Sequence, residues 1–160
     1  MTNPFGFDPN RFQSPPIRRI AAYWLSKCAP HRLPRRADIH LEEIGRDLPF
    51  IYLVDVIEAP LAFRFRLIGT QVSIWSERDY TGASVNAAEY GPNWRQIYEV
   101  YREIITTKVP TVSALHAPWR KREFHYYERF LAPLSEDNVR INMILGALHT
   151  IEPPTARTTL

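Results

Sequence analysis

The chain is poor in cysteine and glycine and has no long apolar run. One cysteine, Cys28, among 160 residues excludes an internal disulfide framework and fits a reducing cytosol. No stretch approaches the ~18 apolar residues that a membrane span needs. The N-terminus also lacks the basic and then apolar pattern of a secretory signal. We therefore expect a cytoplasmic protein that makes no membrane contact.

Motifs of nucleophilic and nucleotide chemistry are also missing. The sequence contains no Gly-x-Ser-x-Gly elbow and no Walker loop. The carboxylates of Asp55, Glu123 and Glu128 have no acidic or nucleophilic partner nearby in the sequence. We expect a protein that is not an enzyme and has no catalytic residues.

The positive charge is small and scattered. The net charge is +3, and basic residues occur in small groups such as Arg18-Arg19 and 120–122. Nucleic-acid binders usually gather such residues on one face or one helix. We expect these groups to be solvated surface and predict no nucleic-acid partner.

Aromatic side chains and prolines are plentiful, with eight Phe, eight Tyr, four Trp and 14 Pro. The length suits one domain with loose ends. We divide the chain into a flexible arm (1–13), an N-terminal helix and connector (14–47), a core domain (48–150) and a disordered tail (151–160). Phe5, Phe7 and Phe12 give the arm apolar rings with which to dock on a surface that the sequence does not specify.

Helical signals occur in four places. Ser14 precedes two prolines, and the apolar residues that follow have helical spacing, which predicts an amphipathic helix over 15–28. A short helix is expected at 41–44, and 70–76 is a short helix or irregular. A longer helix begins at Pro92 or Asn93 and runs to about Thr107.

Alternating, β-branched segments predict five strands. They cover 50–57, 63–68, 111–117, 124–131 and 139–148. Short turns between neighbours, including one at Arg120-Lys121, favour antiparallel pairing. The expected fold class is α+β: a five-stranded antiparallel sheet with helices on one face, preceded by the N-terminal helix.

The first hairpin has a predictable register. With Tyr52, Val54 and Val56 facing inward against Phe63, Phe65 and Leu67, Val56 lies opposite Phe63 and Val54 opposite Phe65. Asp55 then lies opposite Arg64, and this pair is most simply a cross-strand ion pair on the outer face. Arg64 and Arg66 are also candidates for a contact with a partner.

Several short motifs lie along the chain: Tyr23-Trp24, Pro34 to Ile39, Leu48-Pro49, Leu53 to Val56, Phe63 to Thr70, Asp79 to Gly82 and Pro133-Leu134-Ser135. Together they resemble a bacterial stand-alone PAS-like family, once described as a domain of unknown function. The likeness covers Ile17 to Leu148 and implies a PAS fold with a sensory or regulatory role. The family supplies no catalytic residues and has no agreed ligand, so the resemblance implies no binding residue. Asn138 stands where a turn glycine would be usual, and asparagine tolerates a positive φ.

The aromatic middle of the chain gives the best signal for a ligand pocket, although rings at helical spacing also fill ordinary cores. Tyr101 belongs to the same aromatic stripe. The pocket candidates are Tyr52, Phe65, Trp75, Tyr80, Trp94, Tyr98 and His116.

The cofactor is unknown from the sequence, and haem and flavin are both disfavoured. Residues 93–107 contain no His or Cys for a haem iron, and Cys28 precedes the region where a flavin photosensor would need it. His116 and His125 face each other if a two-residue turn joins their strands. Two imidazoles fall short of a zinc site, so no metal is predicted.

Three functions remain open. The leading one is a PAS-like sensor that acts as a homodimer or on a separate signalling protein, with Tyr23 and Trp24 as further interface candidates. The second is a small α+β-barrel enzyme of the isomerase or dehydratase type, with Asp55 or His116 as its acid–base group. The third is a scaffold with a fully packed core. A first strand that lies beside the last strand would favour the PAS arrangement over the barrel.

Overall fold

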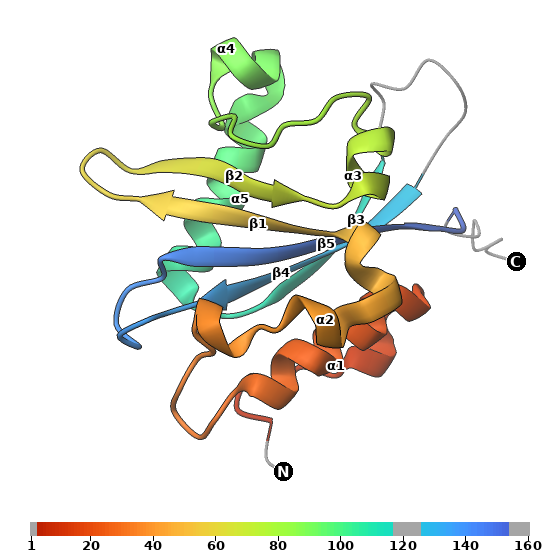
Figure 1. Cartoon of the computed structure of the whole chain (residues 1–160), viewed down its shortest axis with the longest axis vertical. Coiled ribbons are helices and arrows are strands. Elements are labelled where there is room, and N and C mark those ends of the chain that lie inside the picture. Colours follow the sequence, from red (N-terminus) through yellow and green to blue (C-terminus); the bar gives the residue numbers. More distant parts are fainter. Residues whose placement is uncertain (1–2, 117–125, 154–160) are drawn as a thin grey trace, which may run out of the picture.

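The computed structural model describes residues 3–116 and 126–153 (Figure 1). Short 3-10 turns connect several of the elements. The helices are α1 (Pro15–Lys27), α2 (Leu41–Ile44), α3 (Thr70–Trp75), α4 (Ala87–Tyr90) and α5 (Trp94–Thr107). The strands are β1 (Ile51–Ile57), β2 (Ala62–Ile68), β3 (Thr111–His116), β4 (Tyr126–Leu134) and β5 (Met143–Ile151). Within the described ranges, no helix has both the length and the apolar character to cross a membrane.

The strands form one sheet in the order β2-β1-β5-β4-β3, and every neighbouring pair is antiparallel. The predicted α+β fold with a five-stranded antiparallel sheet is confirmed. The first strand lies beside the last, which is the arrangement expected of a PAS domain rather than of a barrel enzyme.

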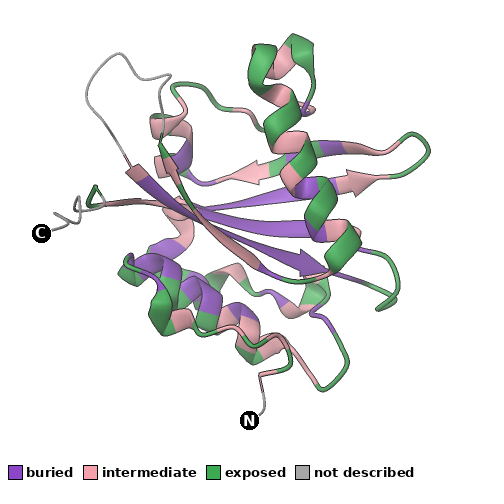
Figure 2. Ribbon diagram, turned by 180° about the vertical axis from the view of Figure 1, so that it is seen from behind, coloured by how far each residue is buried: buried purple, intermediate pink, exposed green. Residues whose placement is uncertain are grey.

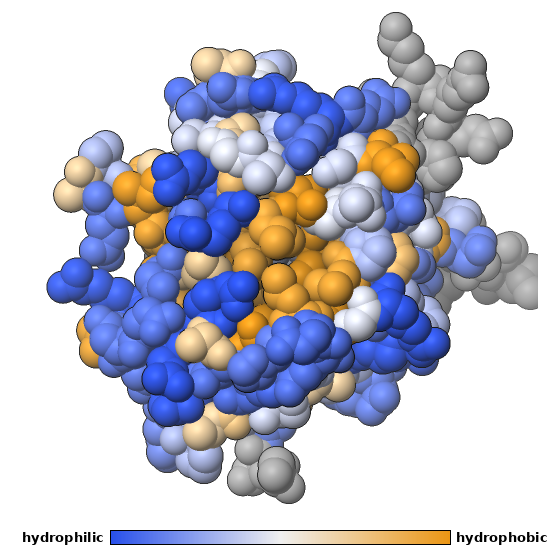
Figure 3. Space-filling view, in the orientation of Figure 1, coloured by the Kyte–Doolittle hydropathy of each residue, from blue (hydrophilic) through white to orange (hydrophobic). Residues whose placement is uncertain are grey.

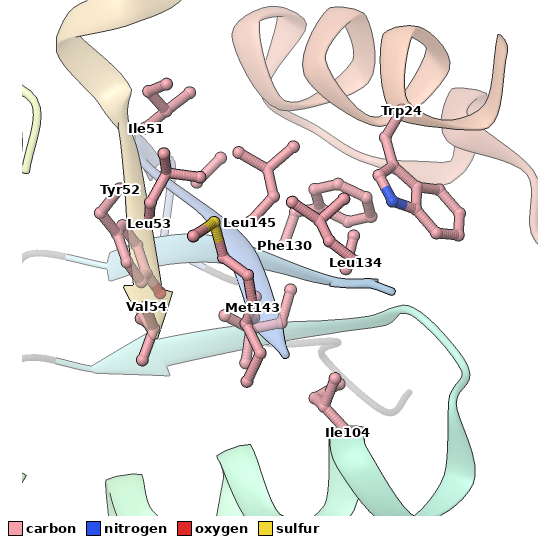
Figure 4. Close-up of a cluster of buried hydrophobic side chains, with 14 of the residues drawn as sticks. Trp24, Ile51, Tyr52, Leu53, Val54, Ile104, Phe130, Leu134, Met143 and Leu145 are labelled. Carbon is pink, nitrogen blue, oxygen red and sulfur yellow. The ribbon is translucent and has the colours of Figure 1, made fainter. Parts of the chain in front are cut away.

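Helices cover the two faces of the sheet unequally. Figure 4 shows the sheet between α1, which carries Trp24, and α5, which carries Ile104. Figure 2 shows that α1 turns its buried side toward the sheet, whereas α5 keeps one side exposed. We call the side toward α5 the inner face; it includes Tyr52, Val54, Phe63, Phe65 and Gly146. The opposite side is the outer face; it includes Leu53, Asp55, Leu145 and Phe130.

The first hairpin has the predicted register over most of its length. Val56 pairs with Phe63, Asp55 with Arg64 and Val54 with Phe65. A bulge between Leu53 and Val54 then shifts the pairing, so that Leu67 lies opposite Leu53 instead of Tyr52. The prediction that Leu67 shares the inward face of Phe65 was therefore wrong, because directly paired residues share a face.

The last two strands differ from their predicted bounds. Asp137 Oδ1 accepts hydrogen bonds from the backbone N–H groups of Val139 and Arg140, both at 2.8 Å. This turn, in which Asn138 has the positive φ of 60°, delays β5 to Met143 instead of 139. β4 extends through Pro133, beyond the end of its pairing with β3, where no ladder hydrogen bond is lost to proline. His125 and the turn at 120–121 lie outside the described residues.

The motifs of the family resemblance have local structural causes. A Cβ atom on Gly69 would lie 2.4 Å from the Pro49 carbonyl oxygen, so Leu48-Pro49 and Ile68-Gly69-Thr70 pack against each other only without a side chain there. Thr81 donates to Asp79 Oδ1 from its backbone N at 2.9 Å and from its hydroxyl at 2.6 Å. The segment after this turn runs along the free edge of β2, with Gly82 N donating to Phe65 O at 2.7 Å.

The segment that we expected to be a flexible arm lies against the outer face. Phe12 is buried, and the ring of Phe7 stacks on Phe130 with centroids 5.7 Å apart. The Ser14 hydroxyl accepts a hydrogen bond from Ile17 N at 3.3 Å and begins α1 as predicted. α1 is therefore fixed to β4 from its first residue.

Candidate functional site

A cluster of aromatic rings fills the inner face below α5. We define this tyrosine cluster as Tyr52, Phe65, Tyr80, Tyr90 and Tyr101. Phe65 of β2 is its centre, with ring centroids 6.1 Å from Tyr52, 6.2 Å from Tyr80, 6.1 Å from Tyr90 and 6.4 Å from Tyr101. Four of its five members carry a hydroxyl group, which distinguishes it from an ordinary apolar core.

Gly146 of β5 makes room for the ring of Tyr52. A Cβ atom at Gly146 would lie 2.2 Å from two carbons of that ring. The ring of Tyr52 therefore packs directly on the β5 backbone. The side chain of any larger residue at position 146 would occupy the space that this ring fills.

Arg129 of β4 brings a positive charge to the same place. It follows Glu128 and precedes Phe130, which both face α1, so alternation along β4 turns Arg129 to the inner face. The residue is only 9% exposed, and its Nε is buried without a hydrogen-bond partner. Across the described residues, no carboxylate lies within ion-pair distance of its guanidinium.

The hydroxyl groups of Tyr52, Tyr90 and Tyr101 stay protonated. Burial raises the pKa of Tyr52, Tyr90 and Tyr101, and the charge of Arg129 acts on all three in the opposite direction. The hydroxyls of Tyr52 and Tyr101 also affect each other, lowering the pKa of Tyr52 and raising that of Tyr101. The site thus combines neutral donors with one buried cation.

Tyr80 and Tyr90 form the partly exposed rim of the cluster. Their ring centroids are 4.8 Å apart, and the Arg78 guanidinium lies 4.7 Å from the Tyr80 ring. Arg78 also pairs with Glu89 of α4, with Nη2 and Oε2 2.6 Å apart. This ion pair ties the turn after α3 to α4 at the outside of the rim.

Only some of the predicted pocket residues come together. Tyr52, Phe65 and Tyr80 belong to the tyrosine cluster. Tyr98 adjoins it through Phe63, at 5.2 Å between centroids, and Trp94 lies against Tyr98 at 5.6 Å.

The other two predicted pocket residues lie elsewhere. Trp75 stacks on Phe50 and contacts His149, with centroids 5.8 Å and 5.9 Å apart. His116 is exposed beside Tyr126 at the end of β3. Sequence reasoning did not find Tyr90 or Arg129. The sequence signal for Arg129 was a single basic residue in a mostly apolar strand, at the spacing that places it on the same face as Leu131.

The predicted interface residues have different surroundings. Arg64 and Arg66 both pair with Asp55 on the outer face, at 3.5 Å and 2.7 Å, as the hairpin register required for Arg64. Trp24 is 0% exposed, and its indole N–H donates to Pro133 O at 3.2 Å. Its ring is therefore used within the chain. Tyr23 accepts a hydrogen bond from His40 N at 2.8 Å and holds the connector to α1.

The best-defined surface hollows of the described part lie away from the tyrosine cluster. One, of about 310 Å³, is lined by Arg19, Tyr23 and Asp47 between α1 and the turn before β1. The other, of about 270 Å³, is lined by Val56 and Arg140 near the β4–β5 turn.

No group of three or more His, Cys, Asp or Glu side chains gathers as a metal site among residues 3–116 and 126–153. Burial raises the pKa of the Cys28 thiol to about 12, so this cysteine is a poor nucleophile.

The solved structures that resemble this chain include PAS and LOV domains. No curated protein matches this sequence. The PAS domain of BvgS from Bordetella pertussis has a TM-score of 0.54 at 13% identity, covering 71% of this chain and 88% of that chain. A LOV protein of Rhodobacter sphaeroides has a TM-score of 0.49 at 15% identity, covering 66% and 61%.

The N-terminal domain of a Marinobacter aquaeolei diguanylate cyclase with a PAS/PAC sensor has a TM-score of 0.43 at 10% identity, covering 62% of this chain and 94% of that chain. A family model described as PAS domain matches residues 12–149, which is most of the sequence. With this match and this strand order, the chain belongs to the PAS domain family.

Proposed function

We propose that this chain is a sensory or regulatory domain that binds a small molecule at the tyrosine cluster. The observation that carries the proposal is the buried, unpaired Nε of Arg129 on the same face as Tyr52, Tyr90 and Tyr101, whose hydroxyls its charge affects. Ligand sites are mostly apolar with a few placed polar groups, and this cluster has that composition. Among the described residues, the members of the cluster and Arg129 include no nucleophile–base pair, and the role that we propose is non-catalytic.

Strand β4 offers a route from the cluster to α1. Arg129 faces inward, whereas the carboxylate of its neighbour Glu128 faces outward and accepts hydrogen bonds from Gln13 N at 3.1 Å and Ser14 N at 2.9 Å. Ser14 begins α1. A shift of β4 on ligand binding would therefore be passed to the start of α1.

The partner would be a second copy of the chain or a separate signalling protein in the cytosol. Figure 3 shows apolar side chains in the middle of the face seen in Figure 1, over β1 and β5, between α2 and β2. The half-exposed Arg64 and Arg66 border it on β2. Apolar areas with a charged border are typical of protein contacts.

The scaffold with a packed core is the competing function, and the close contact of Tyr52 with Gly146 favours it. Native mass spectrometry of the full chain, purified without denaturation, separates the two. We expect an added small mass that is lost on denaturation, and a lower occupancy in Tyr101→Phe than in the control Tyr23→Phe. A bare mass, together with a melting temperature that a small-molecule extract of the producing cells does not change, would favour the scaffold.

A further inference from the structure

The guanidinium of Arg129 has no anionic partner in the part of the chain that the structure describes. We propose that the tyrosine cluster binds a small carboxylate, with Arg129 as its counter-ion. This inference rests on the proposed sensory function and adds the chemical class of the ligand.

Every buried carboxylate of the described chain is already satisfied elsewhere. Asp47 is bonded by both nitrogens of Arg19 at 2.7 Å. Asp55 is paired with Arg66 on the outer face. Glu128 accepts its two backbone hydrogen bonds on the side of the sheet opposite to Arg129. Residues 3–116 and 126–153 therefore hold a buried cation and supply no anion to compensate it, a costly arrangement unless another group completes it.

The surroundings of Arg129 suit a carboxylate. A guanidinium presents a planar fork of N–H donors that matches the two oxygens of a carboxylate. Burial keeps the hydroxyls of Tyr52, Tyr90 and Tyr101 protonated, so they are able to donate to the same oxygens. The rings, with Phe65 at their centre, would cover the apolar part of the molecule.

We place the entry of the ligand at the rim of the cluster. Neither of the two hollows described above is lined by a residue of the cluster. Tyr80 and Tyr90 are the least buried members of the cluster, and the Arg78–Glu89 ion pair lies outside them. Because the rings of Tyr80, Tyr90 and Phe65 pack against one another, we expect a compact acid rather than a nucleotide to enter here.

Matched acid and amide probes test the charge directly. Acetate and acetamide, benzoate and benzamide, and phenylacetate and phenylacetamide are titrated into the full chain by calorimetry, with inorganic phosphate as a tetrahedral anion. We expect at least one acid to bind tenfold or more tightly than its amide and more tightly than phosphate. Arg129→Met should abolish this preference, Arg129→Lys should weaken it, and the exposed control Arg102→Met should keep it.

The ligand-free variants give a second readout. Because the guanidinium Nε of Arg129 is buried without a partner and its side chain forms no ion pair with the described residues, Arg129→Met should melt at the wild-type temperature or above it. A purely structural arginine would instead lower the melting temperature in both Arg129→Met and Arg129→Lys, and that result would overturn the inference. If Arg129→Met does not fold, Arg129→Lys decides the binding comparison.

The inference also fails if no acid is preferred over its amide, including when neither binds, or if the preference survives in Arg129→Met. Native mass spectra of wild type and Arg129→Met that both retain a neutral molecule would contradict the proposal that the ligand is a carboxylate. They would still support the proposed sensory function.

Discussion

At the scale of single residues, the tyrosine cluster depends on the missing side chain of Gly146. In Gly146→Ala, the new methyl group would overlap the ring of Tyr52, and we expect a loss of ~1–3 kcal/mol in the free energy of unfolding. Urea denaturation measures the loss. In a Tyr52→Ala background the same substitution should cost nothing, because alanine restricts the unfolded chain and the ring is gone. An equal loss in both backgrounds would contradict the contact.

His149 predicts a pH dependence of folding. Burial lowers its pKa, and the charge of Arg19 acts in the same direction, whereas Thr150 O, Asp47 and Glu128 oppose it. The unfolded imidazole has a pKa of about 6.5 and binds more protons than the folded one. The contribution of His149 to stability is thus complete above about pH 6.5 and is lost as the pH falls toward the lower folded pKa.

The matched variants are His149→Phe, which keeps a ring against Phe50, and His40→Gln, whose side chain is 49% exposed in wild type. Thermal unfolding between pH 5 and pH 8 should show a smaller loss of stability at acidic pH in His149→Phe than in wild type. In His40→Gln this loss should equal that of wild type. The idea is wrong if the His149→Phe curve runs parallel to that of wild type.

Two contacts of single residues show which interactions the sequence was able to predict and which it was not. The Asp55–Arg64 pair follows from two strands joined by one short turn, so the sequence was sufficient to predict it. Arg129 meets Tyr52 and Tyr101 only after strands and a helix distant in sequence have packed, and no local pattern specifies that meeting.

At the scale of elements, Glu128 fastens α1 to β4. Glu128→Gln keeps the shape but replaces one acceptor oxygen with an NH₂ group, which cannot accept from Gln13 N or Ser14 N. We expect a loss of ~1–3 kcal/mol in the free energy of unfolding, because a buried donor is left without a partner. Hydrogen exchange should become faster across the first turn of α1.

Glu136→Gln is the matched control, because Glu136 also accepts a backbone hydrogen bond, from Arg36 N at 3.2 Å, but in an exposed place. It should change stability and exchange little. If both variants behave alike, Glu128 does not anchor the helix.

The helices and strands differ in how well they can be predicted from the sequence. α1 was predictable, because its cap, prolines and apolar spacing agree. α4 was missed, although Asn86 accepts from Glu89 N at its start, since four residues are too few to show a period. The bulge in the first hairpin and the late start of β5 depend on pairing and on the Asp137 turn, which periodicity does not encode.

At the scale of the whole molecule, we compare two surfaces of the described residues as candidates for a partner contact. α1 buries its apolar side, with Ile17, Ile20 and Trp24, against its own chain, so only its solvent side, which includes Ala22, remains for other proteins. The outer face beside β2 remains uncovered where Figure 3 shows apolar side chains, and Leu67 lies there opposite Leu53. Because Figure 3 shows apolar side chains on the second surface, we expect it to be the better candidate for a homodimer contact.

Charge substitutions distinguish these two surfaces. Leu67→Glu puts a carboxylate on the uncovered outer face, where a dimer would have to bury it without a partner. Ala22→Glu puts the same group on the solvent side of α1. Light scattering coupled to size exclusion should give a two-chain mass for wild type and Ala22→Glu, and a mass near the 18.7 kDa of one chain for Leu67→Glu. Dissociation by Ala22→Glu alone would place the contact on α1, and a single-chain mass for wild type would mean that the partner is a different protein.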